Sequence, residues 1–229
     1  MMRSFSLVDH KVAEAEFFLS KLRECDRNFF AVRCYVSAFA ASARTVTFAL
    51  QSVLSDAPGF EEWYRPHQER LKENRLARFF HEFRRINQHI GDNLVTSGFS
   101  AIGERARFWF GPTPDVSDAP DEDVETACEQ YFKMILVLVL ECYQHFGPLI
   151  DAHQRYTAQY FESQGRTIED AEEEVGFPRG WTDNGDPAAV DYRWQALRSS
   201  LSGCEINHIF TEYLGAQTTV PSRLPPYAC

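Results

Sequence analysis

The sequence predicts an all-α protein, a bundle of about five to six helices with one small β-hairpin. Apolar side chains recur at three- and four-residue spacing along most of the 229 residues, which is typical of amphipathic helices. Hydrophobic residues make up 44% and charged residues 24% of the chain, the balance of a protein with a buried core. Strand-like alternation is confined to residues 94–111. We therefore expect a single helical domain over residues 1–220, followed by a loose tail at 221–229.

Two helices are predicted at the N-terminal end, over residues 12–22 and 29–54. Asp9 can cap the start of the first helix, and a polar break at residues 26–28 separates the two. The second helix contains a run of small residues at 38–43, which allows another helix to approach closely. Both segments are explained by a packed pair of core helices.

The next strongly helical segment, residues 75–90, has one apolar face and one basic face. Its apolar side chains, three or four residues apart, are Leu76, Phe79, Phe80, Phe83, Ile86 and Ile90. The polar side chains that fall largely outside this stripe are Arg78, His81, Arg84, Arg85, Gln88 and His89. Gly91 should end the helix, since glycine is common just past a helix C-terminus. The β-prone residues and glycines that follow at 94–111 predict the hairpin.

The C-terminal half is also predicted to be helical. A helix over residues 124–146 has a centre, 134–140, that is apolar all round and should be the most buried part of the fold. Gly147-Pro148 should kink or break this helix, and the helical pattern then continues to about residue 163.

A short acidic helix and a final long helix complete the predicted elements. The acidic helix covers residues 167–175, and Thr167 and Asp170 at its start are compatible with a capping box. A polar loop follows, and the last helix should run from residue 188 to 213.

Composition excludes several classes of function. The net charge of −10 makes the chain a poor general binder of polyanions, so any nucleic-acid role needs a local basic patch. None of the six cysteines forms a CxxC pair, which argues against zinc-ribbon and thioredoxin-type proteins. The N-terminus lacks a signal-peptide pattern, and the longest apolar run is far shorter than a bilayer span. We therefore expect a cytoplasmic protein with reduced thiols and no association with membranes.

Arg84 and His89 are the strongest candidates for chemistry, as an R-x4-H pattern at the end of a helix. A guanidinium can bind a phosphate and neutralise charge that develops on it. An imidazole can take a proton from a ribose 2′-hydroxyl or give one to the leaving oxygen. These two groups could cleave RNA without a metal ion. One histidine cannot serve at once as base and acid, so two copies facing each other across a dimer are favoured. The alternative is that both residues only cover a polar helix face.

A metal site on the same helix is not expected, and neither is a cofactor. His81 and His89 are two turns apart, about 12 Å along the helix axis, which is too far to share one ion. Arg85 lies between them and opposes a cation. The sequence contains no P-loop or dinucleotide-binding motif, so no nucleotide cofactor is indicated.

The R-x4-H motif on an amphipathic helix, preceded by two long helices, resembles the HEPN superfamily. The resemblance covers roughly residues 12–93 and implies an all-α, HEPN-like bundle that forms a homodimer. Many members are ribonucleases of toxin–antitoxin, phage-defence or RNA-processing systems. The resemblance implies that Arg84 binds the scissile phosphate and that His89 is the catalytic histidine. Arg85 follows the motif arginine, where the superfamily often has Asn, Asp or His.

Two functions follow from this sequence. The first is a metal-independent RNA endonuclease with a composite dimer site, in which Arg85, Asn87 and His81 support Arg84 and His89. Its partners would be a second copy of the chain, RNA, and an antitoxin or another protein. The second is a non-catalytic helical dimerisation or interaction domain whose same face binds a protein or a nucleotide.

Overall fold

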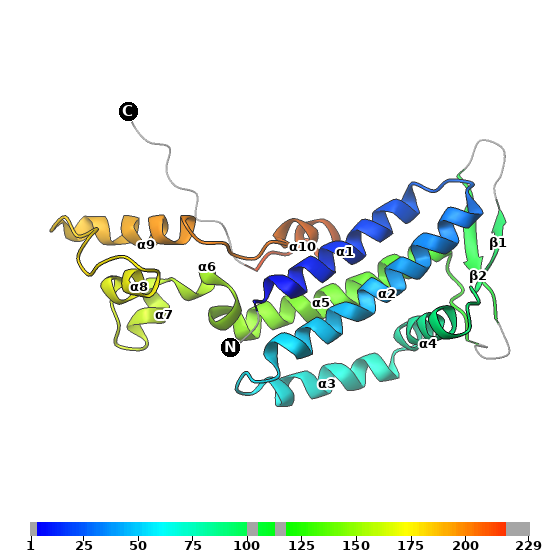
Figure 1. Ribbon diagram of the computed structural model, residues 1–229, viewed down its shortest axis with the longest axis horizontal. Coiled ribbons are helices and arrows are strands. Elements are labelled where there is room, and N and C mark those ends of the chain that lie inside the picture. The colour runs from blue at the N-terminus through cyan, green and yellow to red at the C-terminus, as the bar shows by residue number, and fades with distance from the viewer. Residues whose placement is uncertain (1–3, 100–104, 113–117, 219–229) are drawn as a thin grey trace. The chain divides into compact units, whose positions relative to one another are not determined.

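The computed structural model describes residues 4–99, 105–112 and 118–218. Within these ranges the chain forms ten α-helices, one short 3-10 helix and one two-stranded antiparallel sheet (Figure 1). The predicted all-α class with a small hairpin is therefore confirmed. Six of these helices have ten or more residues, in agreement with the expected five to six. The tail expected at 221–229 lies outside the described residues.

The chain groups into two compact units, Met1–Leu138 and Val139–Cys229. The basic helix with Arg84 and His89 and the β-hairpin both belong to the first unit. The single domain expected over residues 1–220 stays a prediction. Each unit is described separately below.

Helices α1 (Ser6–Arg23) and α2 (Phe29–Leu54) pack against each other in the first unit. Helix α1 begins earlier than predicted, because the buried side chain of Val8 extends its apolar stripe by one turn. Asn28 caps α2, and its side chain accepts a hydrogen bond from the backbone N–H of Ala31 at 3.0 Å.

Helix α3 (Phe60–Glu73) and helix α4 (Arg75–His89) are joined by a single residue, Asn74. The Asn74 side chain accepts a hydrogen bond from the N–H of Ala77 at 3.0 Å and so caps α4. Four residues of the predicted apolar stripe are buried: Phe79, Phe80, Phe83 and Ile86. Gly91 has a φ of +83°, the left-handed conformation typical of glycine after a helix.

The hairpin of β1 (Val95–Phe99) and β2 (Arg107–Phe110) follows α4 directly, where the sequence placed it. Phe110 anchors it to the core. Its ring centroid lies 4.8 Å from that of Phe79, 5.6 Å from Phe83 and 5.9 Å from Phe80. The hairpin thus packs on the apolar face of α4 and leaves the basic face uncovered.

Helix α5 (Val124–Ile150) supplies a further ring to this cluster. Tyr131 stacks on Phe80 with centroids 4.6 Å apart and ring planes 9° apart. The helix runs through Gly147-Pro148 to Ile150, so this pair does not break it. By length and composition α5 could cross a membrane, but half of its apolar stretch is buried inside the protein, as in a core helix.

The second unit also contains shorter helices. They are α6 (Ala152–Arg155), α7 (Ala158–Glu162), α8 (Ile168–Glu174), the 3-10 helix η1 (Pro187–Ala189), α9 (Val190–Ser199) and α10 (Asn207–Leu214). The buried residues of a small core are Phe161, Ile168, Ala171, Trp194 and Leu197. The capping box at the start of α8 is confirmed, with the Thr167 N–H donating to Asp170 at 2.7 Å.

The last helix is a correction to the sequence analysis. One helix was expected over residues 188–213, but the chain forms α9 and α10 with an irregular segment between them. His153 Nε2 is hydrogen-bonded to the backbone oxygen of Leu201 at 2.9 Å. Gly203 lies against the same imidazole, where a Cβ atom would come within 2.5 Å of Nδ1. The segment is rich in serine and glycine, which favour a helix end, and His153 packs against it.

Candidate functional site

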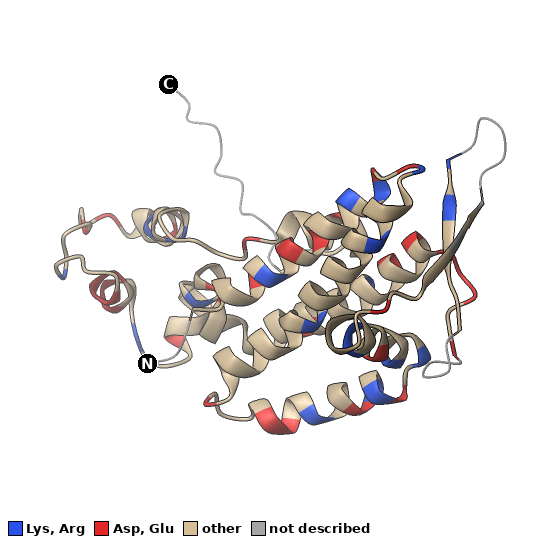
Figure 2. Cartoon of the chain, turned by 45° about the vertical axis from the view of Figure 1, so that its right-hand side comes forward, with Lys and Arg blue, Asp and Glu red and all other residues tan. Residues whose placement is uncertain are grey.

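The five residues proposed for the site all lie in the C-terminal three turns of α4. His81, Arg85 and His89 are exposed, whereas Arg84 and Asn87 are half-buried. Lys and Arg are interspersed with Asp and Glu along α3 and α4 (Figure 2). The basic face of α4 is therefore accessible, but it is not a continuous positive stripe.

Arg84 and His89 do not share one side of α4. His89 follows Arg84 by five residues, and each residue of an α-helix turns the chain by about 100°. The two side chains therefore leave α4 in directions roughly 140° apart, from positions about 7.5 Å apart along its axis. Arg84 lies on the side of α4 toward Tyr131 of α5. Its positive charge opposes the burial that raises the pKa of the Tyr131 phenol to about 12. His89 lies on the exposed side of α4 that points away from Tyr131. A site that uses both residues within one protomer is therefore not preformed on α4.

Arg84 and His89 share one property that suits ligand binding. Neither side chain forms a hydrogen bond or ion pair with another residue that the structure describes. Arg85, in contrast, is held by Glu82, with 2.6 Å between Nε and Oε2. Glu82 also lies 3.9 Å from His81. The two motif residues are thus available to a ligand, and the two neighbouring basic groups share a carboxylate.

Asn87 connects α4 to α2. Its side-chain oxygen accepts a hydrogen bond from the hydroxyl of Ser37, and its Nδ2 donates to the backbone oxygen of Asp92 at 3.2 Å. The same end of α4 is held again by Asn93, whose Nδ2 donates to the backbone oxygen of Arg33 at 3.1 Å. Asn87 therefore positions the end of the motif helix.

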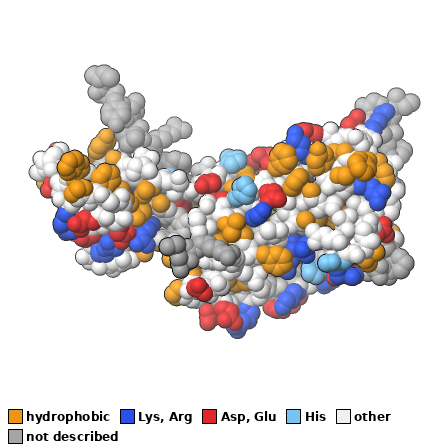
Figure 3. Space-filling view, viewed as in Figure 1, with side chains coloured by type: hydrophobic (Ala, Val, Ile, Leu, Met, Phe, Trp, Pro, Cys, Tyr) orange, Lys and Arg blue, Asp and Glu red, His pale blue; other side chains and the backbone are white. Residues whose placement is uncertain are grey.

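Large apolar side chains are exposed near this end of the first unit. Ile90 was expected in the buried stripe, but it follows the last residue of α4 and its side chain is 59% exposed. Phe30, in the first turn of α2, is 77% exposed. Figure 3 shows hydrophobic side chains gathered where α1 and α2 approach the hairpin. Where exposed apolar side chains form one contiguous patch, they are typical of a surface that contacts another protein.

A cavity of about 520 Å³ opens between α2, α3, α4 and α5. Its wall contains four basic side chains, namely Arg44, Lys72, Arg78 and His81. Aromatic and amide groups complete it, including Phe48, Gln51, Tyr64, Gln68 and Tyr131. Burial raises the pKa of Tyr64, so both phenols of the wall are protonated at neutral pH and can donate hydrogen bonds.

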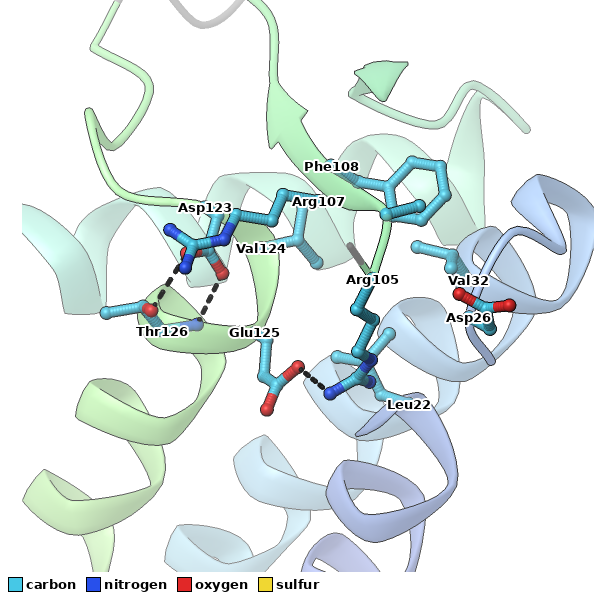
Figure 4. A pocket seen from close by; sticks show the side chains of 11 residues that line it. Leu22, Asp26, Val32, Arg105, Arg107, Phe108, Asp123, Val124, Glu125 and Thr126 are labelled. Carbon is cyan, nitrogen blue, oxygen red and sulfur yellow. Dashed lines mark hydrogen bonds and ion pairs between the residues drawn. The ribbon is translucent and has the colours of Figure 1, made fainter. Parts of the chain in front are cut away.

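A smaller cavity of about 250 Å³ lies at the foot of the hairpin (Figure 4). Two arginines line it, Arg105 and Arg107. Arg105 forms an ion pair with Glu125 at 3.0 Å and also donates a hydrogen bond to the backbone oxygen of Arg23. Asp123 accepts hydrogen bonds from the backbone and side chain of Thr126. Arg105, Glu125, Asp123 and Thr126 are therefore partnered within the protein.

Sequence reasoning missed the residues of the larger cavity. Arg44, Tyr64 and Tyr131 come from three different helices, so no local motif marks them. The signal that was present is Arg44 itself, a lone charge in the Ala- and Ser-rich part of α2. A charged residue among small apolar ones on a core helix indicates either a buried ion pair or a ligand site.

Comparison with known proteins relates the first unit to a phage family. Residues 6–116 match the family model described as Bacteriophage lambda protein ea47. The matched stretch runs from α1 to just beyond β2 and contains Arg84, His89 and most of the larger cavity. No curated protein and no solved structure matches the chain. The chain is thus similar to a phage lambda protein over somewhat less than half of its length.

Proposed function

We propose that the protein is a HEPN-like, metal-independent RNA endonuclease that acts in the cytoplasm as a homodimer. One observation supports this most directly. His89 is exposed and Arg84 is half-buried, and neither side chain has a hydrogen-bond or ion-pair partner among the described residues. A cation left without a carboxylate at a helix end is suited to an anionic ligand such as a phosphodiester.

In the proposed reaction His89 takes the proton of a ribose 2′-hydroxyl. The resulting oxygen attacks the adjacent phosphorus, and the bond from phosphorus to the 5′-oxygen breaks. The partner's His89, in its protonated form, gives a proton to that leaving oxygen. Arg84 neutralises the charge that develops on the phosphoryl oxygens. The products are a 2′,3′-cyclic phosphate and a 5′-hydroxyl.

The separation of Arg84 and His89 around α4 is the reason for placing the site across a dimer. Two copies of α4 that meet at their C-terminal ends would bring the partner's His89 to the Arg84 side of the first copy. Phe30 and Ile90 would supply apolar surface to such a contact. The similarity to a phage protein family is compatible with a role in phage biology, such as a toxin held by an antitoxin.

The test is RNA cleavage by purified protein in EDTA, with His89→Ala beside the wild type. His10→Ala is the matched control, because His10 is exposed on α1, far in sequence from the motif. We expect fragments with 5′-hydroxyl ends from the wild type and the control, and none from His89→Ala. Equal cleavage by all three proteins would remove His89 from the reaction, and wild-type cleavage that disappears in EDTA would contradict a metal-independent mechanism.

A non-catalytic interaction domain is the second candidate, and the exposed Phe30 and Ile90 favour it. In this case His89→Ala and the wild type would both leave RNA intact. Ile90→Asp would then weaken self-association or capture of a protein partner, measured by analytical ultracentrifugation.

A further inference from the structure

From the cavity between α2, α3, α4 and α5 we infer a binding site for a small organic anion with an aromatic or apolar body. The site is separate from the proposed catalytic pair, since neither Arg84 nor His89 lines it. A volume of about 520 Å³ lies within the range of small-molecule sites.

The charge of the cavity wall is opposite to that of the chain. Arg44, Lys72 and Arg78 are positive and Glu82 is negative, so the wall has a formal charge of three minus one, or +2, against −10 for the chain. Glu82 is paired with Arg85, at 2.6 Å, and Lys72 is paired with Glu69, at 2.7 Å. Arg44 and Arg78 are therefore the cations of the wall that have no carboxylate partner among the described residues. A positive concavity in an acidic protein attracts small anions.

Arg44 is the centre of the site. Its Nη1 donates to the hydroxyl of Thr47 at 2.9 Å, and its guanidinium stacks on Phe48 with 4.5 Å to the ring centroid. No carboxylate pairs with it within the described part of the chain, and its Nε is buried there without a hydrogen-bond partner. The charge of Arg44 is therefore not neutralised by a carboxylate among the described residues, and an anion in the cavity would supply the missing counter-charge.

Arg78, on α4, supplies a second cation to the cavity wall. Its Nη1 donates to the backbone oxygens of Glu73, at 3.0 Å, and of Lys72, at 3.5 Å. These bonds hold the guanidinium at the junction of α3 and α4 without neutralising its charge. Two guanidinium groups from different helices can bind one phosphate or carboxylate from two sides.

The remaining wall suits the body of the ligand. Phe48 is 46% exposed, although it lies in the middle of a core helix, and it presents a ring to the cavity. Leu71 and Ala77 add apolar surface, and Tyr64 and Tyr131 add rings with hydroxyl donors. A planar or apolar group attached to the anion would cover these side chains.

The test is isothermal titration calorimetry of the full chain with phenyl phosphate, benzoate and inorganic phosphate. We expect phenyl phosphate or benzoate to bind. The ligand with the higher affinity shows whether the site prefers a phosphate or a carboxylate. Inorganic phosphate should bind at least about tenfold more weakly, because it lacks the apolar body. Arg44→Met and Arg78→Gln should each weaken binding of the stronger ligand by about tenfold or more.

Arg65→Gln is the matched control, because it removes the same charge from the exposed side of α3, outside the cavity. It should leave the affinity within about twofold of wild type. Arg78 is exposed, so Arg78→Gln should fold even if Arg44→Met does not. His89→Ala should bind the ligand normally, which separates this site from the proposed nuclease. Absence of binding by both organic anions, equal weakening by Arg65→Gln, or equal affinity for inorganic phosphate would overturn the proposal.

Discussion

The hydroxyl of Ser37 on α2 donates a hydrogen bond to the side-chain oxygen of Asn87 on α4. Asn87 also donates a hydrogen bond to the backbone oxygen of Asp92. Its side chain therefore holds the end of α4 against α2 and also holds the loop that follows α4. Asn87 was predicted to support Arg84 and His89. The structure gives it a positioning role next to them, through hydrogen bonds within the protein.

Asn87→Ala should destabilise the first unit and disturb the motif helix. The loss of its side-chain hydrogen bonds should lower the free energy of unfolding by roughly 1–3 kcal/mol, measured by urea denaturation. Gln88→Ala is the control, since Gln88 is exposed and should change stability by less than about 0.5 kcal/mol. If Asn87→Ala abolished RNA cleavage at unchanged stability, Asn87 would instead contact the substrate.

A shared catalytic cleft makes a quantitative prediction for mixtures of wild type and His89→Ala. If both histidines of a dimer are required, activity should fall as the square of the wild-type fraction once subunits have exchanged. A linear decrease would mean that each protomer acts alone. Mixtures with His10→Ala at the same ratios should keep full activity, because His10 takes no part in the proposed reaction.

The start of α8 should make the stability of the protein sensitive to acid. A hydrogen bond from Arg179, together with one from the Thr167 N–H, lowers the pKa of Asp170 to about 2. Because the folded-state pKa lies below the ordinary value of 3.8, the stabilisation is present above about pH 4 and is lost as the pH falls toward 2. Asp170→Asn should therefore melt at a lower temperature than wild type at pH 6.

The difference in melting temperature between wild type and Asp170→Asn should shrink as the pH falls from 4 to about 2, when followed by circular dichroism. Glu162→Gln is the control, since Glu162 is exposed on α7 and has no partner among the described residues. A difference that stayed constant over this range would show that the Asp170 carboxylate is not the cause.

Local patterns predicted much of the fold. The spacing of Phe79, Phe80 and Phe83 identified the buried face of α4, and Thr167 with Asp170 identified the start of α8. These features depend on residues within one or two turns of each other, so they are visible in the sequence. The hairpin was also found, because its β-prone residues interrupt an otherwise helical pattern.

Features set by distant contacts could not be read from local patterns. The irregular segment between α9 and α10 is contacted by His153, about fifty residues before Gly203. The larger cavity depends on Arg44, Tyr64 and Tyr131, which meet only after three helices have packed. The same limit applies to the proposed nuclease site. Arg84 and His89 are candidates from the sequence, and a site that two chains share would depend on contacts that no local pattern encodes.

The stack of Tyr131 on Phe80 gives the protein a built-in spectroscopic reporter. Protons held over the face of a neighbouring ring are shielded by its circulating electrons, so the Tyr131 ring resonances should appear well upfield of their usual positions. An unlabelled sample would show them in a simple one-dimensional proton spectrum only while the first unit is assembled. Tyr131 also lines the larger cavity, so the same peaks should shift when a small molecule enters it.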